Sequence, residues 1–272
     1  MQSFKCSPHA LFSSFWVNRR LIYALAGREI AGRYKGSIFG LLWPLINPIF
    51  MLFIYVFVFS VIFSAKWAVD SGSKIEYALI LFPGLLVFNL FAECINRAPS
   101  LIVNNANYVK KVIFPLEIFP WVYLGAALFH LVLGLGVWLI AHCILMGPPP
   151  PYAVMLPFFL LPFLLFIVGL MWILSSLGVF IRDIAQFATI ITSAAMFISP
   201  IFFPVTALPI GFQPYLYLNP LTFPIESARN VLLFGVLPSA TSFVMYCVFS
   251  ISVALVGFAW FQKTRKGFAD VL

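Results

Sequence analysis

The sequence predicts an all-α integral membrane protein with six transmembrane helices, an N-terminal amphipathic interface helix and a re-entrant periplasmic hairpin between helices five and six. Three observations predict this fold. The 272 residues are 63% hydrophobic and only 9% charged, whereas a soluble domain carries about 25% charged residues. Several apolar runs reach the roughly 20 residues that cross the hydrocarbon core of a bilayer. These runs are continuous and do not alternate with a period of two, which favours helices over a β-barrel.

Six apolar runs are the predicted transmembrane helices of a single domain that covers residues 1–272. They are residues 38–63, 77–103, 118–147, 152–181, 184–204 and 243–261. Residues 1–37 precede the first run and lack the short apolar core and small-residue cleavage site of a signal peptide.

The distribution of lysine and arginine predicts the orientation. Most of the sixteen cations lie before the first span, between spans two and three, between spans four and five, and after the last span. The positive-inside rule places these four segments, and with them both termini, in the cytoplasm. The net charge of +8 is then a signal for topology and lipid headgroups. Its spread over separate segments argues against nucleic-acid binding.

Residues 8–34 predict an amphipathic helix that lies along the cytoplasmic membrane surface. Large apolar residues fall roughly on one side of this helix, although Arg19 interrupts the pattern. The apolar positions are Leu11, Phe12, Phe15, Ile22 and Leu25. A disordered basic tail is the alternative, and the density of large apolar residues weighs against it.

The first span carries two prolines and an asparagine within the stretch WPLINPIF. Pro44, Asn47 and Pro48 predict a kink that frees backbone carbonyls. Such a kink is useful where a helix bounds a cavity, so this span is expected to do more than cross the membrane.

Glu93 and Arg97 are the charged pair within the second span. Because they are four residues apart, they share a helix face and are expected to neutralise each other. Ionisable groups inside a membrane are functional candidates, and the residues leave open a structural ion pair or a substrate contact. His130 and His142 are too far apart on the third span to share a metal, so we interpret them as packing or interface histidines. The four cysteines are dispersed, which indicates neither a disulfide nor a metal site.

The cytoplasmic segment 104–115, NNANYVKKVIFP, predicts a short helix that docks a partner. One of its asparagines could cap a helical turn, and Tyr108, Val112 and Ile113 would then project together. An ordinary loop with two lysines is an equally open interpretation of these residues.

Residues 205–241 contain several prolines and aromatic residues, and they are too broken to form a span and too apolar for an ordinary exterior loop. Irregular backbone at membrane depth is tolerated where protein or a water-filled cavity satisfies it. A re-entrant hairpin on the outer side is therefore predicted, with Glu226 and Arg229 paired across one helical turn. A surface loop on the membrane is the alternative.

Three stretches together resemble the permease subunit of ABC exporters for bacterial surface polysaccharides. They are REIAGRYKGSIFGLLWPLINPIFMLFIYVFVFSVIF, NYVKKVIFPLEIFP and YLNPLTFPIESAR. The O-antigen lipopolysaccharide branch is the closest match, and teichoic-acid and capsule exporters are relatives. The resemblance covers essentially the whole chain. It implies a homodimer in the bacterial inner membrane that pairs with two copies of a separate ATPase subunit and exports a lipid-linked polysaccharide to the periplasm.

The resemblance also implies roles for particular residues. In that family the first and fifth spans line the channel, which implies Trp43, Tyr55, Phe59, Phe197 and Phe202 here. The interface helix and the loop after the second span contact the ATPase, which implies Asn107, Tyr108, Val112 and Ile113. The hairpin gates the periplasmic exit, which implies Tyr215, Tyr217, Glu226 and Arg229. For each aromatic residue, packing or lipid contact is the alternative role.

The chain contains no G-x-x-x-x-G-K-[ST] motif, so ATP and Mg²⁺ are expected on the partner subunit and no cofactor is expected in this chain. A membrane-embedded acyl or glycosyl transferase is the alternative from another class. It would need clustered acid–base or metal-ligand groups, whereas the histidines and aspartates here are scattered. A permease of the same architecture for small lipids or drugs is the third interpretation.

Overall fold

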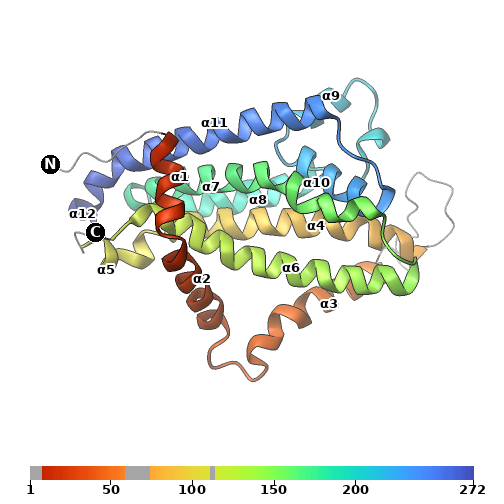
Figure 1. Cartoon of the computed structure of the whole chain (residues 1–272), viewed down its shortest axis with the longest axis horizontal. Coiled ribbons are helices and arrows are strands. Elements are labelled where there is room, and N and C mark those ends of the chain that lie inside the picture. Colours follow the sequence, from red (N-terminus) through yellow and green to blue (C-terminus); the bar gives the residue numbers. More distant parts are fainter. Residues whose placement is uncertain (1–7, 59–73, 111–113) are drawn as a thin grey trace.

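The computed structural model describes residues 8–58, 74–110 and 114–272, and these residues form helices and no β-strand. Four long helices run side by side along the long axis of the molecule (Figure 1). They are α4 (Lys74–Arg97), α6 (Phe119–Leu145), α7 (Leu156–Phe180) and α11 (Ala240–Thr264). The all-α prediction is confirmed for the described residues.

Within the described residues, four helical stretches are long and apolar enough to cross a membrane. They are Glu76–Ser100, Leu116–Leu145, Pro151–Phe180 and Ala240–Val271. The stretch around α4 is the central one, with 83% of its window buried against 28% for the stretch around α6. These four stretches coincide with four of the six predicted spans.

The first and fifth predicted spans correspond to shorter apolar helices, α3 (Trp43–Phe57) and α8 (Ile184–Ile198). Each has 15 residues, which is about 22 Å at 1.5 Å per residue and less than the roughly 30 Å of the hydrocarbon core. Residues 59–73, which follow α3, lie outside the described residues. α8 ends because Ser199 turns to an extended conformation, as expected before Pro200. Six spans therefore remain a prediction.

Glycines set the close approach of α7 and α11. A Cβ on Gly169 would lie 2.8 Å from backbone atoms of Ala254, and a Cβ on Gly257 would overlap the carbonyl of Gly169. Small residues let helices approach closely in lipid, where van der Waals packing replaces the hydrophobic effect as the driving force. The two glycines therefore determine how tightly this helix pair packs.

The predicted interface helix is two helices, α1 (Pro8–Val17) and α2 (Arg19–Tyr34). They meet at Asn18, whose Nδ2 donates to the carbonyl of Ser14 at 2.8 Å. Leu11 and Ile22 are buried as the pattern predicts, whereas Phe12 is 62% exposed. The residues of the predicted apolar side are thus only partly buried within the chain, and the helix is not continuous. Whether it lies along the membrane surface stays a prediction.

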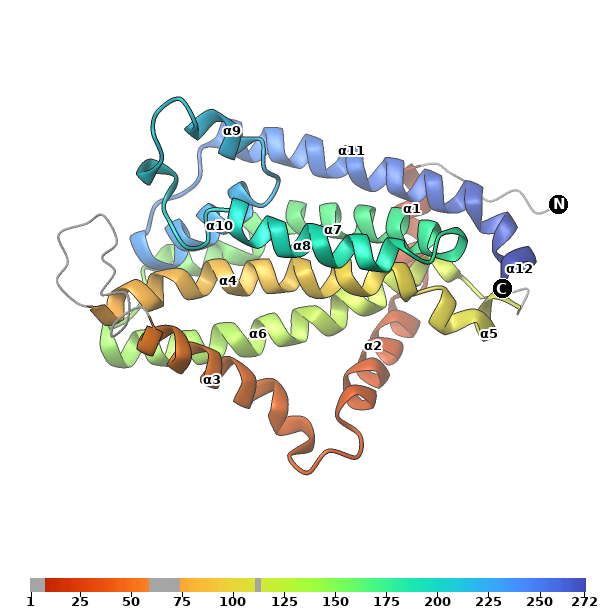
Figure 2. The ribbon, with the colours of Figure 1, turned by 180° about the vertical axis from the view of Figure 1, so that it is seen from behind.

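α2 and α3 diverge from the bundle and meet at residues 35–42 (Figure 2). Gly36 and Gly40 in this connection have φ values of +85° and +48°, a region that glycine adopts without steric cost. Away from the turn, α2 packs on α6, and α3 packs on α4 and α6. The two arms and these two bundle helices therefore surround a common space.

The segment 104–115 begins at the end of the 3-10 helix η4 (Val103–Asn105) and continues into α5 (Ala106–Val109). The ring of Tyr108 lies 4.5 Å from that of Phe114, and its hydroxyl accepts a hydrogen bond from Arg28 Nη2 at 3.0 Å. The ring of Tyr108 is half-buried against the rings of Phe114 and Phe119, and whether it projects together with Val112 and Ile113 stays a prediction. Asn107 is exposed, while Val112 and Ile113 lie outside the described residues.

Residues 205–241 fold at the end of the bundle opposite to the termini (Figure 2). Their helical elements are η7 (Val205–Ala207), α9 (Gln213–Tyr217), α10 (Thr222–Arg229) and the π-helical turn η8 (Asn230–Phe234). Tyr215 and Tyr217 of α9 are 70% and 67% exposed. α10 packs on α4 and α7, and whether the segment re-enters the membrane stays a prediction.

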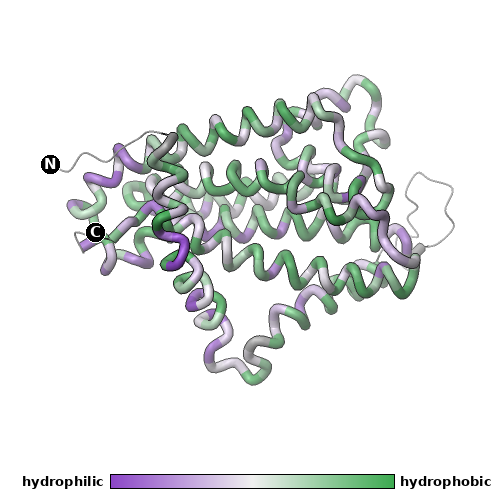
Figure 3. The backbone as a smooth tube through the Cα atoms, in the orientation of Figure 1, coloured by the Kyte–Doolittle hydropathy of each residue, from purple (hydrophilic) through white to green (hydrophobic). Residues whose placement is uncertain are grey.

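Hydrophilic residues gather at the end of the molecule that carries both termini and along α2 (Figure 3). That end also holds α5 and α12 (Phe268–Val271). The cationic segments that the sequence assigns to one side of the membrane therefore lie together. Which side of the membrane this end faces stays a prediction.

Candidate functional site

A cavity of about 810 Å³ lies between α2, α3, α4 and α6. The face of α3 that carries Pro44, Asn47 and Pro48 lines it, which confirms that this part of the chain bounds a cavity. Trp43 and Tyr55 lie on the same wall. One wall of the cavity is therefore formed by the aromatic rings of Trp43 and Tyr55, with the carboxamide of Asn47 between them in the sequence.

The aromatic side chains of this wall are held by neighbours. Trp43 donates from Nε1 to Ser37 Oγ at 2.7 Å, and its ring meets Phe39 edge-on at 5.5 Å. The ring of Tyr55 meets Phe82 of α4 at 6.4 Å. Trp43 stays 41% exposed, so it presents a flat apolar surface that is fixed in orientation.

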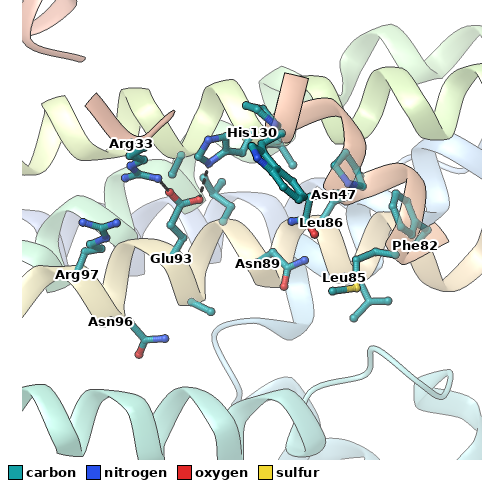
Figure 4. Close-up of a pocket in the computed structure, with 18 of the residues that line it drawn as sticks. Arg33, Asn47, Phe82, Leu85, Leu86, Asn89, Glu93, Asn96, Arg97 and His130 are labelled. Carbon is teal, nitrogen blue, oxygen red and sulfur yellow. Dashed lines mark hydrogen bonds and ion pairs between the residues drawn. The ribbon is translucent and has the colours of Figure 1, made fainter. Parts of the chain in front are cut away.

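The opposite wall is a polar stripe on α4 (Figure 4). Asn89, Glu93 and Asn96 line the cavity at spacings of four and three residues, which places them on one helix face. Asn96 Oδ1 accepts a hydrogen bond from Thr192 Oγ1 of α8 at 2.9 Å. Sequence reasoning missed Asn89 and Asn96, although their helical spacing to Glu93 within an apolar run was a readable signal.

Glu93 binds partners from two other helices. Its carboxylate accepts a hydrogen bond from Arg33 of α2, and its Oε2 lies 3.0 Å from His130 Nδ1 of α6. The hydroxyl of Tyr34 lies 2.9 Å from His130 Nε2. A neutral imidazole that donates from Nδ1 and accepts at Nε2 satisfies both contacts. Glu93 therefore ties α2, α4 and α6 together at the cavity wall.

The predicted pairing of Glu93 with Arg97 is wrong. Arg97 Nη1 lies 3.9 Å from Glu29 Oε1 of α2, and Arg33 Nε also contacts Glu29, at 3.2 Å. Arg33 and His130 approach Glu93 from other helices, and these contacts prevail over the local spacing of four residues. His130 is therefore a hydrogen-bond partner of the Glu93 carboxylate and does more than fill space between helices.

The charges of this cluster balance. Two carboxylates, Glu29 and Glu93, face two guanidinium groups, Arg33 and Arg97. Burial opposes the charge of Arg33, but hydrogen bonds and charges from Glu93 and Glu29 outweigh it and raise the pKa of Arg33 above its ordinary value. The guanidinium therefore stays charged, and the pairing compensates the cost of partly burying these ions.

A second polar centre lies on α10. Arg229 is 1% exposed, and its Nη1 lies 2.5 Å from Glu226 Oε1, which is the predicted pair. Its other nitrogens donate to backbone carbonyls of α4 and of the turn after α8. These carbonyls belong to Ile80 at 3.4 Å, Pro200 at 2.9 Å and Ile201 at 3.0 Å. One buried cation thus joins three segments of the chain.

The structure brings together only some of the predicted site residues. Trp43, Tyr55, Glu93 and Arg97 line the one cavity. Phe197 and Phe202 lie elsewhere, on α8 and after it, with ring centroids 6.4 Å apart. Phe59 lies outside the described residues. Among the described residues, no group of three or more histidine, cysteine, aspartate or glutamate side chains could hold a metal ion.

Comparison with known proteins assigns a family. Over 254 residues the chain is 26% identical to the O-antigen export system permease protein RfbA of Klebsiella pneumoniae, covering 93% of this chain and 95% of that protein. It is 25% identical over 262 residues to RfbA of Myxococcus xanthus, covering 96% and 98%. It is 24% identical over 259 residues to the polysialic acid transport protein KpsM of Escherichia coli, covering 93% and 96%.

The family model described as ABC-2 type transporter matches residues 20–233. The match includes every residue that lines the cavity and the buried Arg229 with its partners. Because it spans most of the chain, the chain belongs to the ABC-2 type transporter family.

Proposed function

We propose that this chain is the channel-forming permease of an ATP-driven exporter, which moves a lipid-linked, O-antigen-like polysaccharide from the cytoplasm to the periplasm. The observation that carries the proposal is its end-to-end similarity to proteins named for O-antigen export and for polysialic acid transport. Coverage of at least 93% of this chain and 95% of each relative leaves no large part of the chain for a separate activity.

The chemistry of the cavity suits a sugar polymer. Trp43 and Tyr55 offer flat apolar faces to pyranose rings, and the carboxamides of Asn47 and Asn89 can both donate to and accept from sugar hydroxyls. Export requires that each contact be weak and that there be several of them. We place the cavity beside the path of the polymer, with Phe197 and Phe202 of α8 on the same path.

The proposed complex contains two copies of this chain and two copies of an ATPase subunit that binds ATP and Mg²⁺. The segment around Asn107 and Tyr108 and the interface helices α1 and α2 face the ATPase. Movement of α2 reaches the cavity through Arg33, because this residue holds Glu93 on α4. The hydrogen bond between Glu93 and His130 extends the same connection to α6.

In this proposal the chain spans the inner membrane six times, counting α3 and α8, and both termini are cytoplasmic. Residues 205–241 form the periplasmic gate. The exposed rings of Tyr215 and Tyr217 border the exit. Arg229, which is paired with Glu226, holds the gate to α4 by donating to the carbonyl of Ile80. Membrane lipids surround the complex, and nucleic acid has no part in it.

Deleting the gene from its host tests the proposal and separates it from both alternatives. If the chain is an export permease, the deletion strain should lose surface polysaccharide and accumulate lipid-linked polymer inside the cell. A transferase predicts that the polymer is not completed, and a small-molecule permease predicts normal surface polysaccharide. Expression of the parental chain should restore the surface polymer. Either of the two other patterns would exclude the polysaccharide permease.

A further inference from the structure

The helix α11 makes polar contacts near both of its ends with segments that the proposed complex uses. It runs along the bundle from the end that carries residues 205–241 to the end that carries both termini (Figure 1). Its 25 residues correspond to about 37 Å at 1.5 Å per residue. One helix therefore extends from the segment proposed as the periplasmic gate to the segment 104–115 proposed to face the ATPase.

Arg265, the C-cap residue of α11, holds the end of the segment 104–115. Its Nη2 donates to the carbonyl of Phe114 at 2.7 Å, and its Nη1 donates to Glu117 Oε2 at 2.5 Å. The side chains of Arg265 and Glu117 are only 11% and 14% exposed, so solvent and salt screen this ion pair weakly. A guanidinium makes both bonds at once because its donors form a rigid planar fork.

Glu117 and Phe114 are in turn held by other helices. Ser14 of α1 donates from Oγ to Glu117 Oε1 at 3.3 Å, and Trp172 of α7 donates from Nε1 to the Glu117 carbonyl at 3.0 Å. The ring of Phe114 lies 4.5 Å from the ring of Tyr108 on α5. Ring packing thus joins α5 to the residue whose carbonyl is bound at the end of α11.

Tyr246, near the start of α11, holds the proposed gate. Its hydroxyl donates to the carbonyl of Pro220 at 3.0 Å, and its ring stacks on that of Phe223 with centroids 4.6 Å apart. Pro220 lies between α9 and α10, and Tyr246 is 7% exposed. Tyr246 and Arg265 therefore bind two segments far apart in the molecule from the two ends of one helix.

The part of α11 between these two contacts has little freedom to bend or slide. Sharp kinks in helices arise mainly at prolines, at π-bulges or where a group enters the hydrogen-bond ladder, and α11 is a continuous α-helix without proline. It packs along α7, where Gly169 and Gly257 bring the two backbones into contact. A displacement at one end of α11 is therefore passed on to the other end.

We propose that Arg265 and Tyr246 are positioning residues through which α11 passes the movement of the segment 104–115 to the periplasmic gate. This role rests on the proposed function, from which the roles of the two segments are taken. The connection through Arg33 and Glu93 ends at the cavity, whereas the connection through α11 ends at the exit. The ATPase thus times the opening of the exit without touching it.

The test is a double-mutant cycle in the reconstituted complex, with export per ATP hydrolysed as the measured quantity. Arg265→Gln removes the ion pair with Glu117, and Tyr246→Phe removes only the hydroxyl that binds Pro220. Each variant should lower export per ATP about fivefold, which corresponds to about one net hydrogen bond, while ATP hydrolysis stays near the parental rate. If α11 carries the movement, the double variant should also lie about fivefold below the parent, whereas independent effects would multiply to about twenty-five-fold.

Lys266→Gln is the matched control, because it removes the next cation of the chain, which is exposed, and it should keep the parental coupling. If Arg265→Gln does not assemble, Arg265→Lys takes its place in the cycle with a smaller loss, because an ammonium lacks the fork of donors.

Parental coupling in both single variants, or a multiplied loss in the double variant, would overturn the role of α11. A parallel fall of export and ATP hydrolysis in the single variants would also overturn it, because it would show that the two residues only stabilise the fold. A parental complex that hydrolyses ATP but exports no polysaccharide would instead overturn the proposed function, and with it this role.

Discussion

Arg33 on α2 binds the carboxylate of Glu93 on α4, a residue sixty positions later in the chain. This contact connects the interface helix directly to the most deeply buried helix of the bundle. His130 binds the same carboxylate from α6, so Glu93 is the residue through which these three helices are joined.

Replacing Glu93 by Gln should uncouple ATP hydrolysis from export. The amide keeps the shape of the carboxylate but removes the charge that holds Arg33, and losing a charged hydrogen bond costs about 1.5–3 kcal/mol. We expect export per ATP hydrolysed to fall about tenfold or more in the reconstituted complex. Arg97→Gln is the control, because the side chain of Arg97 makes only a 3.9 Å contact with Glu29. In this variant, export per ATP hydrolysed should fall less than threefold. Parental coupling in Glu93→Gln would exclude this role.

Replacing Arg229 by Met should destabilise the chain. The change leaves Glu226 and three backbone carbonyls without their buried donor, and breaking a buried ion pair costs about 3–5 kcal/mol. The melting temperature of the variant, measured by thermal unfolding in detergent, should be lower than that of the parental chain. Arg229→Lys should recover only part of this loss, since an ammonium lacks the planar fork of donors. Tyr217→Ala, at an exposed site, is the control. A melting temperature unchanged in Arg229→Met would contradict the structural role.

Replacing a single aromatic residue of the cavity by alanine should reduce export mildly, and replacing two should reduce it further. Trp43→Ala or Tyr55→Ala removes a ring surface worth about 0.5–1.5 kcal/mol by analogy with aromatic pairs, and neighbouring sites compensate part of the loss. Surface polysaccharide should fall two- to fivefold in each variant and further in the double variant. Trp260→Ala, an exposed position on α11 that does not line the cavity, should have no effect. Equal export by the double variant and the parent would remove the cavity from the polymer path.

Adding one methyl group at Gly257 should disturb the α7–α11 contact. The new Cβ would overlap the backbone carbonyl of Gly169, and overpacking of this kind costs about 1–3 kcal/mol. Gly136→Ala on α6 is the matched control, because its Cβ meets no atom of the described chain within 4 Å. We expect a clearly lower melting temperature for Gly257→Ala and an equal or higher one for Gly136→Ala. The reverse order would show that the helix seam is looser than described.

Cysteine labelling should fix the orientation. In a background without native cysteines, Asn107→Cys should react with a membrane-impermeant maleimide only from the cytoplasm. Ala207→Cys should react from the periplasm. Both positions are exposed. The helix α5, which contains Asn107, and the segment 205–241, which contains Ala207, lie at opposite ends of the bundle, so the two variants serve as controls for each other. The opposite pattern would invert the proposed topology.

The long helices could be predicted because the information is local. An apolar run such as that of α6 or α7 must satisfy its backbone internally wherever it lies in a membrane, so length and composition are enough. The shorter helices could not be judged in this way. α8 ends where Ser199 and Pro200 leave the helical conformation, and the position of that break depends on the backbone and not on hydropathy.

The polar contacts of the site could be predicted only where both partners share a helix. Glu226 and Arg229 are three residues apart and do pair. Glu93 and Arg97 are also correctly spaced, yet Glu93 binds residues that are distant in sequence, because packing brings Arg33 and His130 to it. Spacing shows which pairs are possible, whereas tertiary structure decides which of them form.

The position of Arg229 in the chain has a consequence for biogenesis. Its acceptors on Ile80, Pro200 and Ile201 all leave the ribosome before it does. The carbonyls of Pro200 and Ile201, at the end of α8, are therefore without this donor until nearly thirty further residues have been synthesised. The end of α8 therefore gains its last hydrogen bonds only after α10 has emerged, so a truncation just before Arg229 should leave this end without its donor even though the sequence of α8 is complete.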